Sequence, residues 1–233
     1  MEKKKFDEEF YKLLSKYSQA NELIKCLNDY GEVIVFGGAI REFNDNKFNN
    51  IPRDFDIVIK KNNHNNTSLD ELLNKFNYKK NRFDGYKIYA NSLEFDIWEI
   101  EKTWAFKEKK INCAENEYVK KLQDTVFLNI DSVVYNITKQ ELYNKEYEKA
   151  MKDRVLDVVL EENPYIELNI LRAILFKKKY DMNFSNKLIK VINSFVNKNK
   201  DYLEKIYRTQ FSHYNTCKIK KIELEAEMRS FIK

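Results

Sequence analysis

Asp54 and Asp56 stand one residue apart at the start of an apolar stretch, RDFDIVI (residues 53–59). In a β-strand, residues i and i+2 share a face, so the two carboxylates project together while Phe55 and Ile57 turn toward the core. Two carboxylates so close repel each other unless a cation lies between them. Mg²⁺ is bound in proteins by one or two carboxylates together with substrate phosphate oxygens. The spacing therefore predicts a divalent-metal site.

A third acid lies further along the chain, in EFDIW (residues 94–98). The apolar neighbours Phe95 and Ile97 of Asp96 predict a strand that packs them inward and leaves Asp96 on the opposite face. Glu94 shares that face, so either acid could be the third ligand. A third carboxylate beside Asp54 and Asp56 would complete a two-metal clamp.

Two of the chain's four glycines, Gly37 and Gly38, follow the apolar stretch EVIVF and precede AIREF. Adjacent glycines between a strand and a helix let the backbone approach a ligand closely, and the first N–H groups of the helix can face an anion. This arrangement favours phosphate binding. A diglycine can also be a plain turn, and an Asp-x-Asp strand can be a half-exposed edge. The ordered combination of the two favours a site.

The elements that would carry these residues are mixed up to about residue 137. Apolar spacing predicts an amphipathic helix over residues 5–29, ended by Gly31. Strands, turns and short helices should alternate over residues 32–100, with a helix N-cap at Thr67 or Ser68. Beyond about residue 140 only helical periodicity is visible. We therefore expect an α+β fold with a catalytic head at residues 1–140 and a helical, basic region at residues 141–233.

Composition narrows the class of protein. At 233 residues, with 34% charged and 14% aromatic residues, the chain can bury a core and should be globular. Cys26, Cys113 and Cys217 are odd in number and far apart, which argues against a disulfide framework and against a cysteine zinc site. No apolar run of membrane-spanning length and no signal peptide is expected. A reducing cytoplasm is the simplest location.

Charge is distributed unevenly. Residues 172–233 hold fifteen Lys and Arg against six Asp and Glu, a net charge of +9, so the first 171 residues sum to −4. A basic C-terminal third is the footprint of a polyanion-binding region. The alternative is a set of solvated helix faces.

The motifs FGGAIRE and RDFDIVI together resemble the head domain of the DNA polymerase β superfamily of nucleotidyltransferases. They are most similar to the group of bacterial tRNA CCA-adding enzymes and poly(A) polymerases, whose signature is a strand, G-G-x-V-R-D, a loop and D-x-D. FLNIDSVVYNI (127–137) and NPYIELNILRAILFKKKYDMNFS (163–185) look like later motifs of that group. The resemblance covers about residues 28–184.

This resemblance implies a polymerase β-like head, a mixed sheet flanked by helices, followed by an all-helical extension. It implies transfer of a nucleoside monophosphate from a nucleoside triphosphate to a hydroxyl, with release of pyrophosphate and use of two Mg²⁺ or Mn²⁺ ions. Asp54 and Asp56 would bind both metals and Asp96 the one that activates the hydroxyl. The implied nucleotide-binding residues are Gly37, Gly38, Arg41, Asp131 and Arg172.

The chain also departs from the family pattern, with Glu42, Asp131 and Asn169 where the family has Asp, Asn and Arg. Three functions stay open. The first is template-independent addition of NMP or dNMP to a nucleic-acid 3′ end, with tRNA or another acceptor held by the basic C-terminal helices. The second is a defence-type or toxin-type enzyme that makes a nucleotide signal or oligomer, self-primed or not, or modifies tRNA. The third is an inactive relative that binds nucleic acid.

Overall fold

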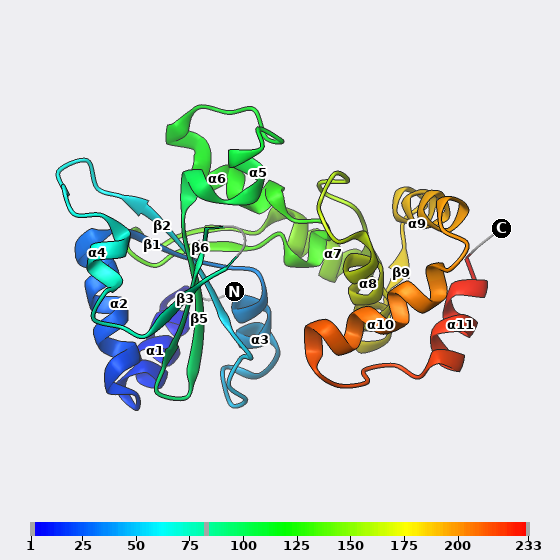
Figure 1. Cartoon of the computed structure of the whole chain (residues 1–233), viewed down its shortest axis with the longest axis horizontal. Helices are drawn as coiled ribbons and strands as arrows, with labels where there is room; N and C mark the ends of the chain where they lie inside the picture. Colours follow the sequence, from blue (N-terminus) through cyan, green and yellow to red (C-terminus); the bar gives the residue numbers. More distant parts are fainter. Residues whose placement is uncertain (1–2, 82–83, 232–233) are drawn as a thin grey trace. The chain divides into compact units, whose positions relative to one another are not determined.

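The computed structural model describes residues 3–81 and 84–231, which form two compact units (Figure 1). The first unit comprises residues 1–125 and 131–145. The second comprises residues 126–130 and 146–233. The acids and the diglycine of the predicted site all belong to the first unit.

The first unit is built on a seven-stranded sheet of order β3-β4-β5-β2-β1-β6-β7. Its strands are β1 (Gly31–Phe36), β2 (Phe55–Lys61), β3 (Tyr78–Lys80), β4 (Tyr86–Ala90), β5 (Leu93–Glu99), β6 (Val134–Asn136) and β7 (Glu141–Tyr143). Strands β2 and β5 are parallel, and the other neighbouring pairs are antiparallel. The sheet is therefore mixed, as predicted.

Short helices surround this sheet. They are α1 (Lys3–Ser15), α2 (Ser18–Tyr30), α3 (Gly38–Asn46), α4 (Leu69–Leu73), α5 (Trp104–Lys107) and α6 (Tyr118–Lys121). The 3₁₀ segments are η1 (Ile100–Lys102), η2 (Glu115–Glu117), η3 (Leu122–Thr125) and η4 (Asn129–Asp131). The single helix expected over residues 5–29 is in fact two, because Tyr17 adopts an extended conformation between α1 and α2. Ser68 is the N-cap of α4 and forms a capping box with Glu71.

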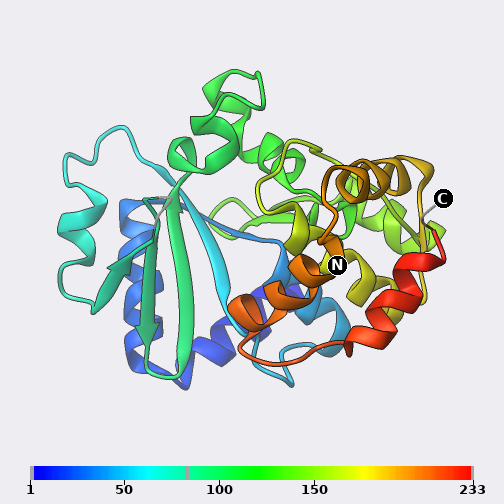
Figure 2. The same cartoon turned by 45° about the vertical axis from the view of Figure 1, so that its right-hand side comes forward.

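One face of the sheet is covered by an aromatic core. Helices α1 and α2 lie beside the sheet in both views (Figures 1 and 2). The buried rings that meet here are Phe6, Phe10, Phe43, Phe48, Phe55, Phe95 and Tyr135. Each fully buried side chain of this size contributes about 1.5–3 kcal/mol relative to exposure in water. This burial fixes which face of β2 and β5 points inward.

The opposite face of the sheet carries a second apolar layer. Its buried residues are Ile34, Val58, Ile100, Phe106, Val119, Leu122 and Val134. The segment from η1 to η3 thus covers part of this face. Because Val58 follows Asp56 by two residues, Asp56 stands on this second face of the sheet.

The second unit is helical apart from one small parallel sheet. Its helices are α7 (Lys145–Asp153), α8 (Ile166–Tyr180), α9 (Asn186–Lys198), α10 (Tyr202–Tyr214) and α11 (Lys221–Arg229). Strands β8 (Val155–Leu156) and β9 (Asn183–Phe184) form the two-stranded sheet. Together the two units confirm the predicted α+β class with C-terminal helices. Within the described part of the chain, no helix has the length and apolar character needed to cross a membrane.

Candidate active site

Three carboxylates gather at neighbouring strands of the first unit. Oxygens of Asp54, Glu94 and Asp96 all lie within 4.8 Å of one another. Asp54 stands directly before β2, and the other two acids lie on β5, the parallel neighbour of β2. The structure therefore brings together two of the three predicted metal ligands, with Glu94 as the third member of the cluster.

The aromatic core dictates this arrangement. Phe55 of β2 and Phe95 of β5 are fully buried and stack at 5.3 Å between ring centroids. Since side chains alternate along a strand, the residues on either side of these rings must face the other way. Asp56 and Asp96 are accordingly paired in register on that opposite face. Asp56 thus adjoins the cluster of three oxygens without belonging to it.

The diglycine lies next to these acids. The last residue of β1, Phe36, pairs with Asp56, so the bend begins one residue from the acidic face. Gly37 has φ +64° and ψ −115°, a conformation open to glycine and costly for other residues. Its N–H donates to the Val133 carbonyl at 2.9 Å. Gly38 then begins α3, whose first N–H groups have no partners within the helix.

Arg41 and Asp131, both predicted to bind the nucleotide, form an ion pair with each other. The two residues are only 7% and 6% exposed. They join α3 to the segment that also accepts the hydrogen bond from Gly37, and so support the diglycine bend. Arg172, the remaining predicted residue, belongs to α8 of the second unit, where its guanidinium lies 5.6 Å from the Phe176 ring centroid.

Two cations that the sequence analysis did not select contact the acid cluster. Lys87 of β4 donates to Asp96 Oδ2 at 3.0 Å and also pairs with Glu94. Arg53 donates to Asp54 Oδ2 through Nε at 3.0 Å and Nη2 at 2.6 Å. Burial alone would lower the pKa of the Lys87 ammonium, but its hydrogen bonds to Glu94 and Asp96 outweigh burial and raise it.

The negative charge of Asp96 is the one in the cluster that burial disfavours, so a bound cation would stabilise it. Burial raises the pKa of its carboxyl, and the Lys87 ammonium only partly opposes that rise. Its Oδ1 atom is buried and receives no hydrogen bond from the residues that the structure describes. A desolvated carboxylate oxygen without a donor is costly unless something binds it. Carboxylate oxygens are the ligands that Mg²⁺ and Mn²⁺ accept, so the cluster fits such an ion.

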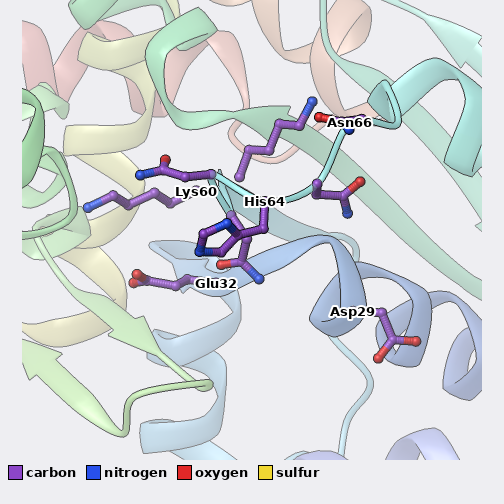
Figure 3. Close-up of a pocket in the computed structure, with 9 residues that line it drawn as sticks. Asp29, Glu32, Lys60, His64 and Asn66 are labelled. Atoms are coloured by element: carbon purple, nitrogen blue, oxygen red, sulfur yellow. The ribbon is translucent and has the colours of Figure 1, made fainter.

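A polar hollow, drawn in Figure 3, is lined by residues where β1 begins and β2 ends, away from the acids. Glu32, Lys60 and His64 are among the residues that line it. Glu32 is held there by Lys139 at 2.7 Å and by the Asn136 amide at 2.8 Å. Because β1 runs from this hollow toward Gly37, the hollow and the acid cluster lie at opposite ends of the same strands. It contributes nothing to the cluster.

Known proteins were compared with the chain by sequence and by structure. No family model and no curated protein sequence matches it. A solved CCA-adding enzyme in complex with ATP matches 94% of the chain with a TM-score of 0.63 at 19% identity. The chain therefore shares its fold with the matched part of the CCA-adding enzyme.

Two further solved structures match the chain in fold. The Thermotoga maritima CCA-adding enzyme complexed with tRNA matches 86% of the chain with a TM-score of 0.59 at 18% identity. A tRNA nucleotidyltransferase complexed with a primer tRNA and an ATP analogue also matches 86% of it, with a TM-score of 0.59 at 16% identity. The chain spans about half of these proteins, covering 54%, 46% and 57% of the three in the order given.

Proposed function

We propose that this chain is a metal-dependent, template-independent nucleotidyltransferase. It would move NMP or dNMP from a nucleoside triphosphate to a hydroxyl, with the 3′ end of a nucleic acid as acceptor. The acid cluster beside the diglycine bend carries this proposal. The fold shared with CCA-adding enzymes supports it.

The proposed reaction makes a bond between the acceptor hydroxyl oxygen and the α-phosphorus. It breaks the bond from that phosphorus to the bridging oxygen, so that pyrophosphate leaves and the hydroxyl proton is lost. Such a transfer asks a protein for alignment and for charge neutralisation more than for covalent chemistry. Mg²⁺ or Mn²⁺ held by the acids would supply the positive charge that neutralises the phosphates.

The chain's own residues divide this work. Asp54, Asp56 and Asp96 would hold the ions, with the buried Oδ1 of Asp96 available as a ligand atom. Gly37 and Gly38 would let the β and γ phosphates approach the backbone at the start of α3. Arg41 would contribute through its pair with Asp131, which supports the bend.

The acceptor would be held by the second unit. Residues 172–233 carry the net charge of +9 within this unit, and a surface of that sign attracts a phosphate backbone. Arg172 lies at the start of the same stretch. The reaction would then take place on the first unit, and the acceptor would bind to the helical second unit.

An incorporation assay tests the proposal. The full chain would be mixed with Mg²⁺ or Mn²⁺ and each labelled NTP or dNTP, with and without total tRNA. We expect label in RNA, and at least a hundredfold less of it with Asp54→Asn/Asp56→Asn, which keeps the side-chain shape but removes the charge of metal ligands. Asp29→Asn, an exposed substitution on α2, is the matched control and should retain activity.

The assay also separates the alternatives. Label in a small product formed without RNA would replace the nucleic-acid acceptor with a nucleotide signal or oligomer. Absence of label in every combination, from protein that is folded and binds RNA, would indicate an inactive relative and overturn the proposal.

A further inference from the structure

The acid cluster already contains a cation supplied by the chain. The Lys87 ammonium contacts two of the three clustered carboxylates, those of Glu94 and Asp96. It thus occupies the side of the cluster on which Asp96 would offer its Oδ2 atom to a metal. A monovalent ammonium and a divalent ion compete for the same carboxylate oxygens.

The sheet holds Lys87 in this position. Residues 87 and 96 are opposite each other in the antiparallel β4–β5 pair, and residue 94 lies two places along on the same face. Such cross-strand neighbours bring oppositely charged side chains together without any adjustment of the backbone. The contact therefore follows from the register of the hairpin.

The second cation of the cluster is held less firmly. Arg53 pairs with Asp54, lies in a bend outside any strand, and has a side chain that is 54% exposed. The Lys87 side chain is 30% exposed, and its partners are 24% and 14% exposed. An exposed pair exchanges readily with water, whereas a partly buried one is screened less.

We infer that Lys87 is an internal counter-ion that holds the acid cluster in the ion-free protein, and that Glu94 is the residue which retains Lys87 once a metal takes Asp96. Lys87 is then a positioning residue that lowers metal affinity, and Glu94 is its partner and no metal ligand. Of the two acids that share a face of β5, Asp96 is then the metal ligand and Glu94 is not. The inference rests on the proposed function, because it concerns the same metal site.

Mn²⁺ binding to the full chain without nucleotide, measured by the electron paramagnetic resonance of free Mn²⁺, tests the inference. Lys87→Met removes the competing charge, and Lys87→Gln keeps a hydrogen-bond donor in case the methionine variant folds poorly. We expect roughly fivefold tighter Mn²⁺ binding in either variant, the size expected of one partly screened charge pair. Lys80→Met is the matched control, because Lys80 lies on β3 of the same sheet and pairs with Asp70 of α4, outside the cluster. The Mn²⁺ affinity of this variant should equal that of the wild type.

A double-mutant cycle tests the role of Glu94. In the wild-type background, Glu94→Gln should weaken Mn²⁺ binding, because Lys87 is left with Asp96 alone. In the Lys87→Met background, the same substitution should weaken binding clearly less, because only the through-space attraction of the Glu94 charge is lost. If it weakens binding equally in both backgrounds, Glu94 is a metal ligand and the inference fails.

Two other outcomes would overturn the inference, and they differ in whether the proposed function survives. Mn²⁺ affinity that is unchanged in both Lys87 variants would leave Lys87 as a structural cross-strand pair, and the proposed function would stand. No Mn²⁺ binding by the wild type or by any variant would remove the metal site, and the proposed function would fall with it.

Discussion

At the scale of single residues, Gly37 is the position where the backbone of the site is most constrained. Its φ of +64° and ψ of −115° lie outside the regions that residues with a Cβ adopt easily. Its N–H donates to Val133 and its carbonyl accepts from the Arg41 N–H at 3.2 Å. The residue thus joins β1, α3 and the segment after η4.

We expect Gly37→Ala to lower the free energy of unfolding by about 1–3 kcal/mol, the usual cost of a strained backbone conformation. Gly38→Ala is the matched control, since a Cβ there would meet the Arg41 guanidinium at an ordinary 3.8 Å and alanine favours a helix. Urea denaturation measures both. Equal costs for the two substitutions would show that the backbone at residue 37 is not the constraint.

The clustered acids could be predicted from sequence because strand alternation is a local rule. Lys87 could also have been found. The two-residue loop at Asn91 and Ser92 makes residues 90 and 93 partners, and counting outward by equal steps pairs residue 87 with residue 96. No local pattern gives the pairing of Arg41 with Asp131, because 90 positions of sequence separate them.

At the scale of elements, β1, β2 and β5 could be predicted from the sequence, whereas β6 and β7 could not. β1, β2 and β5 carry six or seven residues with a clear apolar pattern. β6 and β7 have three residues each, and β6 depends on pairing with β1, about a hundred positions earlier. Three residues are too few to show a period, so tertiary pairing alone defines such strands.

Helix α1 is tied to the sheet by a carboxylate whose titration should be visible in the stability. The Tyr135 hydroxyl of β6 donates to Asp7 Oδ2 at 2.8 Å. Burial raises the pKa of the Asp7 carboxyl above its ordinary 3.8, and the hydrogen bond from Tyr135 opposes the rise only in part. The folded state therefore binds this proton more tightly than the unfolded state does. Protonated Asp7 therefore stabilises the fold at low pH, and this stabilisation is lost as pH rises through the raised pKa of its carboxyl.

We expect Asp7→Asn to remove this loss, because an asparagine oxygen can still accept from Tyr135 but carries no charge to desolvate. The free energy of unfolding of the variant minus that of the wild type should therefore increase as pH rises from below 3.8 to neutrality. Asp29→Asn, an exposed substitution on α2, is the control. Denaturation curves over this pH range that keep a constant offset between Asp7→Asn and the wild type would contradict the assignment.

At the scale of the whole molecule, some lysines of the basic second unit are paired with acids of the same unit. Lys177 and Lys178 of α8 pair with Glu227 and Glu223 of α11 at 2.6 and 3.1 Å. These pairs link α8 to α11, and the charge of each lysine is offset by its partner. The number of charges follows from the sequence, but which lysines form ion pairs with acids of another helix does not.

Three exposed lysines on α9 and just beyond it, Lys190, Lys198 and Lys200, are better candidates for holding an acceptor. Each contact between a lysine and a phosphate of a single strand releases about 0.7 of a counterion, so replacing all three with glutamine should reduce the slope of log affinity against log salt by about 2. Fluorescence anisotropy with labelled tRNA over a series of KCl concentrations measures that slope.

The control replaces three exposed lysines of the first unit, residues 16, 25 and 79, and so removes the same total charge. Because salt-dependent binding reports contacts and not net charge, the two triple variants should differ if the second unit holds the acceptor. A slope that falls equally in both would mean that the nucleic acid is attracted by overall charge. A slope that falls only in the control would place the acceptor on the first unit, and the helical unit would then need another role.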